Sequence, residues 1–192
     1  MPNWCSNGVE ISHEDPAKLE ALAQAVREGK FCDHVIPVPE DLKITAGFLG
    51  DGEEQKKLEE ATARNVAKYG VGNWYDFCVS RWGTKWDVDP YDGGDVQIEN
   101  GVLSFGFDSA WAPPVGIYDA LVEDGFSVRA YYYEPGMCFV GKYEDGIDDY
   151  FEYGGETSKT VREAIGDELD DYFNISEDMA MWEEENEEED AE

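Results

Sequence analysis

The clearest folding signal in the chain is Val96-Gln97-Ile98-Glu99-Asn100-Gly101-Val102-Leu103-Ser104-Phe105-Gly106-Phe107. Two strand-like runs flank Asn100-Gly101, a dipeptide that favours a two-residue hairpin turn because both residues tolerate positive φ. The sequence therefore predicts a β-hairpin with strands over 96–99 and 102–107.

Helix and strand patterns continue on the C-terminal side of this hairpin. Pro113-Pro114 suits the first turn of a helix, and Gly125 ends the apolar face that follows. The later elements expected are strands over 126–133, 137–143 and 147–153, and then a helix from Ser158 with apolar residues at helical spacing.

The N-terminal side begins with a strand and a helix. Residues 4–11 alternate imperfectly in the manner of a strand, and Asp15-Pro16 supplies an N-cap and a first helical residue. The further elements expected before the hairpin are a strand over 31–38, a charged helical insertion over about 45–72, a helix from Trp74 that Gly83 caps, and a strand opened by Trp86. Together these elements indicate an α+β fold.

The composition favours a folded protein and limits what it binds. Of 192 residues, 42% are hydrophobic and 14% aromatic, which is typical of a chain with a core. Asp and Glu number 45 against 14 Lys and Arg, so the net charge is -31. This surplus disfavours direct nucleic-acid binding and attraction to an anionic membrane, and no apolar run is long enough for a spanning helix. Since nothing marks the chain for secretion, we expect a cytoplasmic protein.

Much of the negative charge lies near the C-terminus. Residues 167–192 hold 14 acids and no Lys or Arg, and eight of the last ten residues are acidic. We therefore expect one α+β domain over 1–155, an acidic helical extension over 156–182 and a disordered acidic tail over 183–192.

Four motifs, taken in order, resemble those of a known family. They are Met1-Pro2-Asn3-Trp4-Cys5-Ser6-Asn7, Ile36-Pro37-Val38-Pro39-Glu40, Trp82-Gly83-Thr84-Lys85-Trp86-Asp87 and Phe107-Asp108-Ser109-Ala110-Trp111-Ala112-Pro113-Pro114. Over residues 1–146 the chain resembles the Api-ninety-two-like proteins of phages, plasmids and integrated elements. The resemblance implies a ferredoxin-like sheet, mixed or antiparallel, with helices packed on one face. It implies no catalytic chemistry, and the acidic segment after Gly155 lies outside it.

The turn from Trp82 to Trp86 is a candidate ligand-binding site. A lysine beside aromatic faces suits an anionic ligand or a nucleobase. The candidate residues are Trp82, Thr84, Lys85, Trp86, Asp108 and Trp111. Structural roles account for the same residues: Trp82 in the core, Lys85 paired with an acid such as Asp87, and Asp108 or Ser109 as a helix cap.

Patterns that carry catalysis or bind metals are not found in the sequence. The four cysteines, Cys5, Cys32, Cys78 and Cys138, stand far apart, which favours buried thiols over a zinc site. Neither His13 nor His34 lies in a recognisable motif, and residues 145–149 lack the order of a calcium loop. We therefore expect a non-enzymatic protein with no cofactor and no metal site.

The acidic extension has three interpretations: a solubilising segment, an adaptation to high salt, or mimicry of nucleic acid by closely spaced carboxylates. The leading hypothesis is a phage or plasmid accessory protein that binds and inhibits a host protein with a basic surface, acting in defence or nucleic-acid processing. The acids expected to bind are Asp167, Glu168, Asp170, Asp171, Glu177 and Asp178. The alternatives are a small-ligand module or enzyme at the Trp82–Trp86 turn, and an aromatic binding surface that includes Tyr131, Tyr132 and Tyr133, of which at least one points away from the core.

Overall fold

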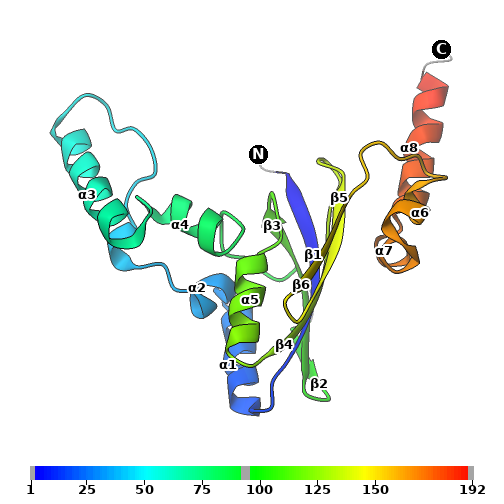
Figure 1. Cartoon of the computed structure of the whole chain (residues 1–192), viewed down its shortest axis with the longest axis horizontal. Helices are drawn as coiled ribbons and strands as arrows, with labels where there is room; N and C mark the ends of the chain where they lie inside the picture. The colour runs from blue at the N-terminus through cyan, green and yellow to red at the C-terminus, as the bar shows by residue number, and fades with distance from the viewer. Residues whose placement is uncertain (1–2, 92–95, 190–192) are drawn as a thin grey trace.

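A six-stranded antiparallel sheet organises the molecule (Figure 1). The computed structural model describes residues 3–91 and 96–189. The strand order across the sheet is β2-β3-β1-β4-β5-β6. The strands are β1 (Trp4–Ser12), β2 (Gln97–Glu99), β3 (Val102–Ala110), β4 (Ser127–Glu134), β5 (Phe139–Glu144) and β6 (Ile147–Glu152).

The first four strands have the ferredoxin-like arrangement. Helix α1 (Pro16–Arg27) follows β1, and helix α5 (Val115–Glu123) connects β3 to β4, so these elements run in the order βαββαβ. The antiparallel order β2-β3-β1-β4 places the first and third strands in the centre of this unit. Strands β5 and β6 extend the sheet beyond β4, and the expected α+β class is confirmed.

Local turn and cap chemistry forms as the sequence predicts. The hairpin between β2 and β3 turns at Asn100 and Gly101, whose φ angles of 52° and 82° are both positive. Asp15 is the N-cap of α1, and its side chain accepts the backbone N–H of Ala17 at 2.9 Å. Pro16 occupies the first turn, where the helix has no backbone hydrogen bond to lose.

Two predictions of strands are wrong. Residues Phe31–Val35 form a short helix, α2, because the carboxylate of Asp87 accepts the N–H groups of Cys32 and Asp33 at 2.7 and 2.9 Å. Trp86 opens no strand in the described part of this segment, since residues 87–91 make only an isolated pairing between Pro90 and Phe107.

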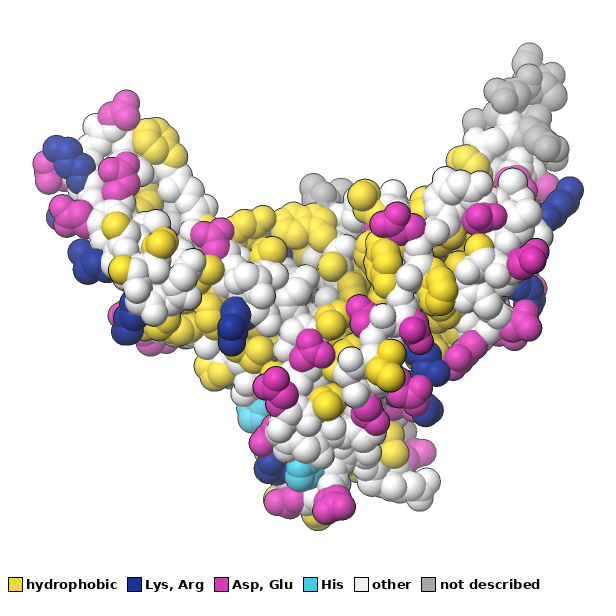
Figure 2. Space-filling view, in the orientation of Figure 1, with side chains coloured by type: hydrophobic (Ala, Val, Ile, Leu, Met, Phe, Trp, Pro, Cys, Tyr) yellow, Lys and Arg dark blue, Asp and Glu magenta, His cyan; other side chains and the backbone are white. Residues whose placement is uncertain are grey.

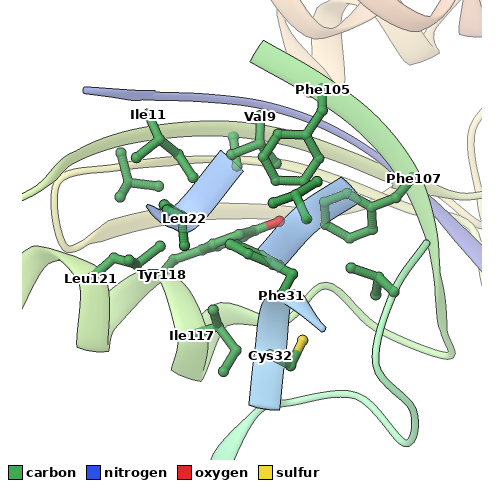
Figure 3. Packing of buried hydrophobic residues seen from close by; sticks show 14 of the residues in the cluster. Val9, Ile11, Leu22, Phe31, Cys32, Phe105, Phe107, Ile117, Tyr118 and Leu121 are labelled. Carbon is green, nitrogen blue, oxygen red and sulfur yellow. The ribbon is translucent and has the colours of Figure 1, made fainter. Parts of the chain in front are cut away.

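The main core lies between the sheet and the helices α1, α2 and α5 (Figure 3). Phe31 from α2 packs edge-on against Phe105 from β3, with ring centroids 5.3 Å apart. Tyr118 from α5 is fully buried, and its hydroxyl donates to the side-chain oxygen of Asn7 at 3.3 Å. The helices expected on one face of the sheet are therefore held there by apolar packing and by a buried hydrogen bond.

The C-terminal extension covers part of the opposite face of the sheet (Figure 1). Its helices are α6 (Val161–Ile165), α7 (Asp167–Phe173) and α8 (Ile175–Glu189). The single helix expected from Ser158 is interrupted at Gly166, whose φ of 88° is left-handed. The helices pack on Tyr131, Tyr133 and Val140, whereas Tyr132 points into the sheet's other side and is fully buried.

Helix α8 also corrects the expected extent of disorder. It continues to Glu189, through residues that the composition assigns to a disordered tail. Residues 190–192 of that tail lie outside the described residues. As Figure 1 shows, the last turns of α8 extend past the sheet and past α6 and α7.

The segment between α2 and the Trp82–Trp86 turn forms a lobe at the opposite end of the molecule (Figure 1). It contains the 3-10 helix η1 (Glu40–Leu42) and the helices α3 (Glu53–Tyr69) and α4 (Trp74–Arg81). Asn65 fixes α3 by donating to the backbone oxygens of Asp41 and Gly72 at 2.7 and 3.0 Å. Within the described residues, none of the helices has the length and apolar character needed to cross a membrane.

Candidate functional site

Two of the predicted ligand-binding residues have structural roles. Trp82 is buried, and its indole N–H donates to the backbone oxygen of Ile36 at 2.9 Å. Thr84 is also buried, and its hydroxyl donates to Ala110 O at 3.1 Å and accepts Ala110 N–H at 3.0 Å. Both side chains attach the turn to its neighbours, so neither is free to hold a ligand.

Lys85 lies among aromatic rings. Its ammonium nitrogen is 4.2 Å from the ring centroid of Trp86, 5.3 Å from that of Trp111 and 5.6 Å from that of Tyr75. Each distance is within the range of a cation–π contact. Among the described residues Lys85 forms no ion pair, and Asp87, the expected partner, caps α2. Burial raises the pKa of the Asp87 carboxyl. We call Tyr75, Trp86 and Trp111 the aromatic cage.

Exposed aromatic residues continue from the cage along one end of the sheet. Trp4 stacks obliquely near Trp86, with centroids 6.2 Å apart, and both indoles are partly exposed. A groove of about 610 Å³ is lined in part by Trp111, Met137 and Tyr150. Figure 2 shows hydrophobic side chains exposed in the hollow between the α3 lobe and the C-terminal helices.

Trp111 has a strained backbone. Its φ of 70° lies in the left-handed region, which is an outlier for a bulky residue. The N–H of Trp111 donates to Asn3 O at 2.9 Å, and 40% of the side chain's surface is exposed. The strained conformation thus presents an indole at the surface and closes one side of the aromatic cage.

Asp108 caps no helix. Its carboxylate accepts the hydroxyls of Tyr91 and Ser6 at 2.8 and 3.0 Å, on the face of the sheet opposite α5. Ser109 also leaves α5 uncapped, since its hydroxyl donates to the Ala112 backbone oxygen at 2.8 Å inside the core. The six predicted residues therefore separate into two structural residues, three residues around the cage, and Asp108 in a different groove.

Four of the six acids expected to bind a partner make contacts within the protein. Arg162 pairs with Asp167 at 2.7 Å and also contacts Asp171. Glu168 accepts the Tyr131 hydroxyl at 2.6 Å and the Lys142 ammonium at 3.0 Å. These contacts hold α6 and α7 together and attach α7 to the sheet.

Asp170 is inside the protein and unavailable to a partner. Only 2% of its surface is exposed, and its oxygens accept both the N–H and the hydroxyl of Ser176 at 2.7 Å. Glu177 and Asp178 are exposed on the first turn of α8. The six acids consequently do not form one free row of carboxylates.

Sequence reasoning missed the exposed apolar residues of α8. Met181 and Trp182 are 61% and 67% exposed, while Ile175 on the same helix is buried. Ile175, Met179 and Trp182 follow the spacing i, i+4, i+7 of one helical face. The signal was available in the sequence, but the acidic composition of the segment obscured it.

A second feature without a sequence signal is a groove of about 590 Å³ over β1 and β3. Gly8 and Gly106, which are partners across the two strands, form its floor. Tyr91 and Tyr172 line it from loops and helices far apart in the chain. Only the folded structure brings these four residues together.

Metal-ligating side chains and cysteine thiols are the remaining candidate groups. No group of three or more His, Cys, Asp or Glu residues there has the arrangement of a metal site. Burial raises the pKa of Cys5 and of Cys78 to about 12, and it raises that of Cys32 as well. These three thiols are packing residues, as the cysteine spacing predicts.

Comparisons with known proteins give one distant similarity. No family model matches the sequence, and no curated protein matches it. Among solved structures, the chain is similar to the crystal structure of the protein api92 from Yersinia pseudotuberculosis, family-model DUF1281. The identity is 12%, the match covers 81% of this chain and 99% of that chain, and the TM-score is 0.42.

Proposed function

We propose that the protein is a non-enzymatic accessory protein that binds another protein with a basic surface. The projecting half of α8 is the docking element. In the proposal the partner is a cytoplasmic host protein whose activity the binding inhibits, and the basic surface is one that nucleic acid would otherwise occupy. The resemblance to phage and plasmid proteins supports this context.

The observation that carries the proposal is the combination of apolar and acidic residues on α8. Met181 and Trp182 are the exposed apolar side chains, and six of the seven residues over 183–189 are Glu. An amphipathic helix of this kind suits an apolar groove rimmed by Lys and Arg. Tryptophan is frequent among residues that dominate binding energies, because it buries a large rigid surface.

The energetics of the free helix favour such a partner. Carboxylates near a helix C-terminus oppose the helix dipole, and α8 has no basic residue in its last turn. Each unfavourable charge costs about 0.3–1 kcal/mol at an exposed position. A basic partner would remove this cost and would gain from long-range electrostatic attraction during association.

The rest of the protein holds α8 in place for docking. Ile175 is buried in the C-terminal core, and Asp170 fixes Ser176 at the helix start. Directly after the apolar pair, Glu183 accepts the N–H and hydroxyl of Ser158 at 2.9 and 2.6 Å. These contacts reduce the conformational entropy that the helix would lose on binding.

The experiment is capture of binding proteins by the immobilised full chain from a bacterial lysate, with identification of each captured protein and repetition with that protein purified. We expect a basic partner whose affinity falls as salt rises. Trp182→Ala should weaken the purified complex by at least about tenfold, the loss typical of a binding hot spot.

Two controls distinguish specific docking on α8 from nonspecific hydrophobic or electrostatic binding. Phe48→Ala removes an equally exposed aromatic residue from the α3 lobe and should leave affinity unchanged. Glu184→Lys with Glu185→Lys should weaken binding, whereas Glu54→Lys with Glu60→Lys on α3 makes the same charge change and should have a smaller effect. Recovery of no basic partner, or equal effects of Trp182→Ala and Phe48→Ala, would refute the proposal.

A further inference from the structure

A groove of about 590 Å³ lies over β1 and β3, on the face of the sheet that the C-terminal helices cover in part. Its floor consists of alternate residues that point away from the main core, among them Ser6, Gly8, Ser104 and Gly106. Gly8 pairs directly with Gly106. Neither of these two glycines has a side chain, so aromatic rings from outside the two strands approach their backbone closely.

Aromatic rings close the groove from two sides. Tyr91 lies over Gly106, where an added Cβ would come within 2.8 Å of the ring. Tyr172, from α7, lies over Gly8, and its hydroxyl would overlap a Cβ there. Tyr131 stacks on Tyr172 with centroids 4.3 Å apart and ring planes 16° apart. The walls are thus flat π surfaces held in place by the sheet.

The charge of the groove is negative. None of the residues that line it is Lys or Arg, and Glu10 is its acidic member. Asp108 lies at the far side of Tyr91, where a neighbouring groove of about 420 Å³ continues toward Trp4 and Trp86. Arg129 forms a long ion pair with Glu10 at 3.8 Å and a closer one with Glu144 at 2.7 Å. The exposed Glu10 carboxylate therefore shares its cation with Glu144 and has capacity for a second one.

We propose that this groove receives an arginine side chain from an extended segment of a protein partner. The inference rests on the proposed function and names a second point of contact on the same basic partner. A guanidinium group is planar, so it stacks on tyrosine rings while its N–H groups bond to a carboxylate. The groove provides both features, with Tyr91 and Tyr172 as faces and Glu10 as acceptor.

Charge and shape select arginine over other groups. A phosphate or nucleotide would meet Glu10 and Asp108 without a compensating cation in the lining. A lysine ammonium matches the charge but is a compact, strongly hydrated ion that gains less from two flat rings. Carboxylates spaced along β1 and β3 suit a segment that carries more than one arginine.

The test is a nuclear magnetic resonance titration of the isotopically labelled full chain with two peptides, acetyl-Gly-Arg-Gly-Arg-Gly-amide and its lysine counterpart. Both peptides carry the same charge, so general attraction to an acidic protein affects them equally. We expect saturable shifts of the Gly8 and Gly106 amide signals with the arginine peptide, and weaker, non-saturating shifts with the lysine peptide.

Variants locate the site. Ser104→Trp fills the groove from an exposed position on β3 and should abolish the saturable shifts, and Glu10→Gln should lower the affinity by about two- to fivefold, as expected for one exposed ion pair. Glu123→Gln removes an exposed carboxylate from α5 and should change nothing. The spectra themselves report whether each variant folds.

Each outcome decides one proposal. Equal binding of both peptides, or saturable shifts that persist in Ser104→Trp, would overturn the arginine groove. If either result is found while partner capture still depends on Trp182, the arginine groove is refuted and the function proposed for α8 is retained. If the arginine peptide binds as expected but no basic partner is captured, the groove stands and the proposed function fails.

Discussion

Asp170 accepts two hydrogen bonds from Ser176, one from its backbone N–H and one from its hydroxyl, both at 2.7 Å. The pair joins the end of α7 to the first turn of α8 across Asn174, whose φ of 55° is left-handed. A buried acid in so acidic a segment is therefore a capping residue that determines where the last helix begins.

Replacing Asp170 should destabilise the C-terminal layer. Asp170→Ala leaves the partly buried N–H of Ser176 without an acceptor and removes an ion pair with Arg162 at 3.3 Å, so we expect a loss of about 1–3 kcal/mol in the free energy of unfolding. Asp171→Ala, which removes an exposed partner of Arg162, should cost less than about 1 kcal/mol. Chemical denaturation followed by circular dichroism measures both, and equal losses would show that Asp170 does not cap α8.

Thiol reactivity should distinguish Cys138 from the other three cysteines. With a pKa of about 12, Cys5 and Cys78 are thiolates in only about one molecule in ten thousand at pH 8. Cys138 is only half-buried. A thiol-specific reagent should therefore label one cysteine quickly in the native protein and all four after unfolding, and Cys138→Ser should remove the fast phase. A fast phase that persists in this variant would disprove the assignment.

The contact between α7 and the sheet should weaken in acid. Hydrogen bonds from Tyr131 and then Lys142 lower the pKa of Glu168 below its usual value of 4.5. A lowered carboxyl pKa contributes stability above the unfolded value, and that contribution is lost as pH falls through the folded value. Because Glu168 is largely exposed, the contribution is at most about 1 kcal/mol.

The measurement is the stability of wild type and Glu168→Gln between pH 7 and pH 3. The difference between them should be constant near neutrality and should shrink as the pH falls below 4.5. The control is Glu163→Gln, which makes the same change at an exposed position on α6. Its stability near neutrality should match that of the wild type more closely than the stability of Glu168→Gln does. A Glu168 difference that grows in acid would contradict the assigned direction.

The sequence predicts those parts of the fold that depend on interactions between residues close together in the chain. The hairpin at Asn100-Gly101 and the cap at Asp15 depend on residues next to them, so short patterns suffice. Helix α2 was predicted as a strand because its cap, Asp87, lies more than fifty residues away along the chain. No window of sequence around Phe31 contains that carboxylate.

The same reasoning explains the candidate sites. The composition of the Trp82–Trp86 turn predicts a ligand site. Thr84 in that turn is buried because its hydroxyl bonds to Ala110 at the end of β3, which lies far away in the sequence. The acids of the extension look equivalent in sequence, and only packing separates Asp170 inside from Glu177 outside. The Gly8–Gly106 floor needs strand register, which alternation within one strand does not specify.

Lys85 and its aromatic cage provide a last prediction. The ammonium group, 4.2 Å from the Trp86 ring centroid, occupies the place where the three rings attract a cation. Removing the side chain in Lys85→Ala should vacate the cage while costing no more than about 1 kcal/mol of stability. Tetramethylammonium, with affinity on the order of millimolar, should then quench the tryptophan fluorescence of the variant in a saturable manner.

Two comparisons make this cation test specific. The neutral isostere tert-butanol should not reproduce the quenching, because the attraction depends on charge. Wild-type protein should respond weakly, since its own lysine already fills the cage, and Lys85→Ala with Trp111→Ala should lose the response. If wild type and Lys85→Ala bind tetramethylammonium equally, Lys85 does not occupy a cation site, and the aromatic cluster is a packing feature of the turn.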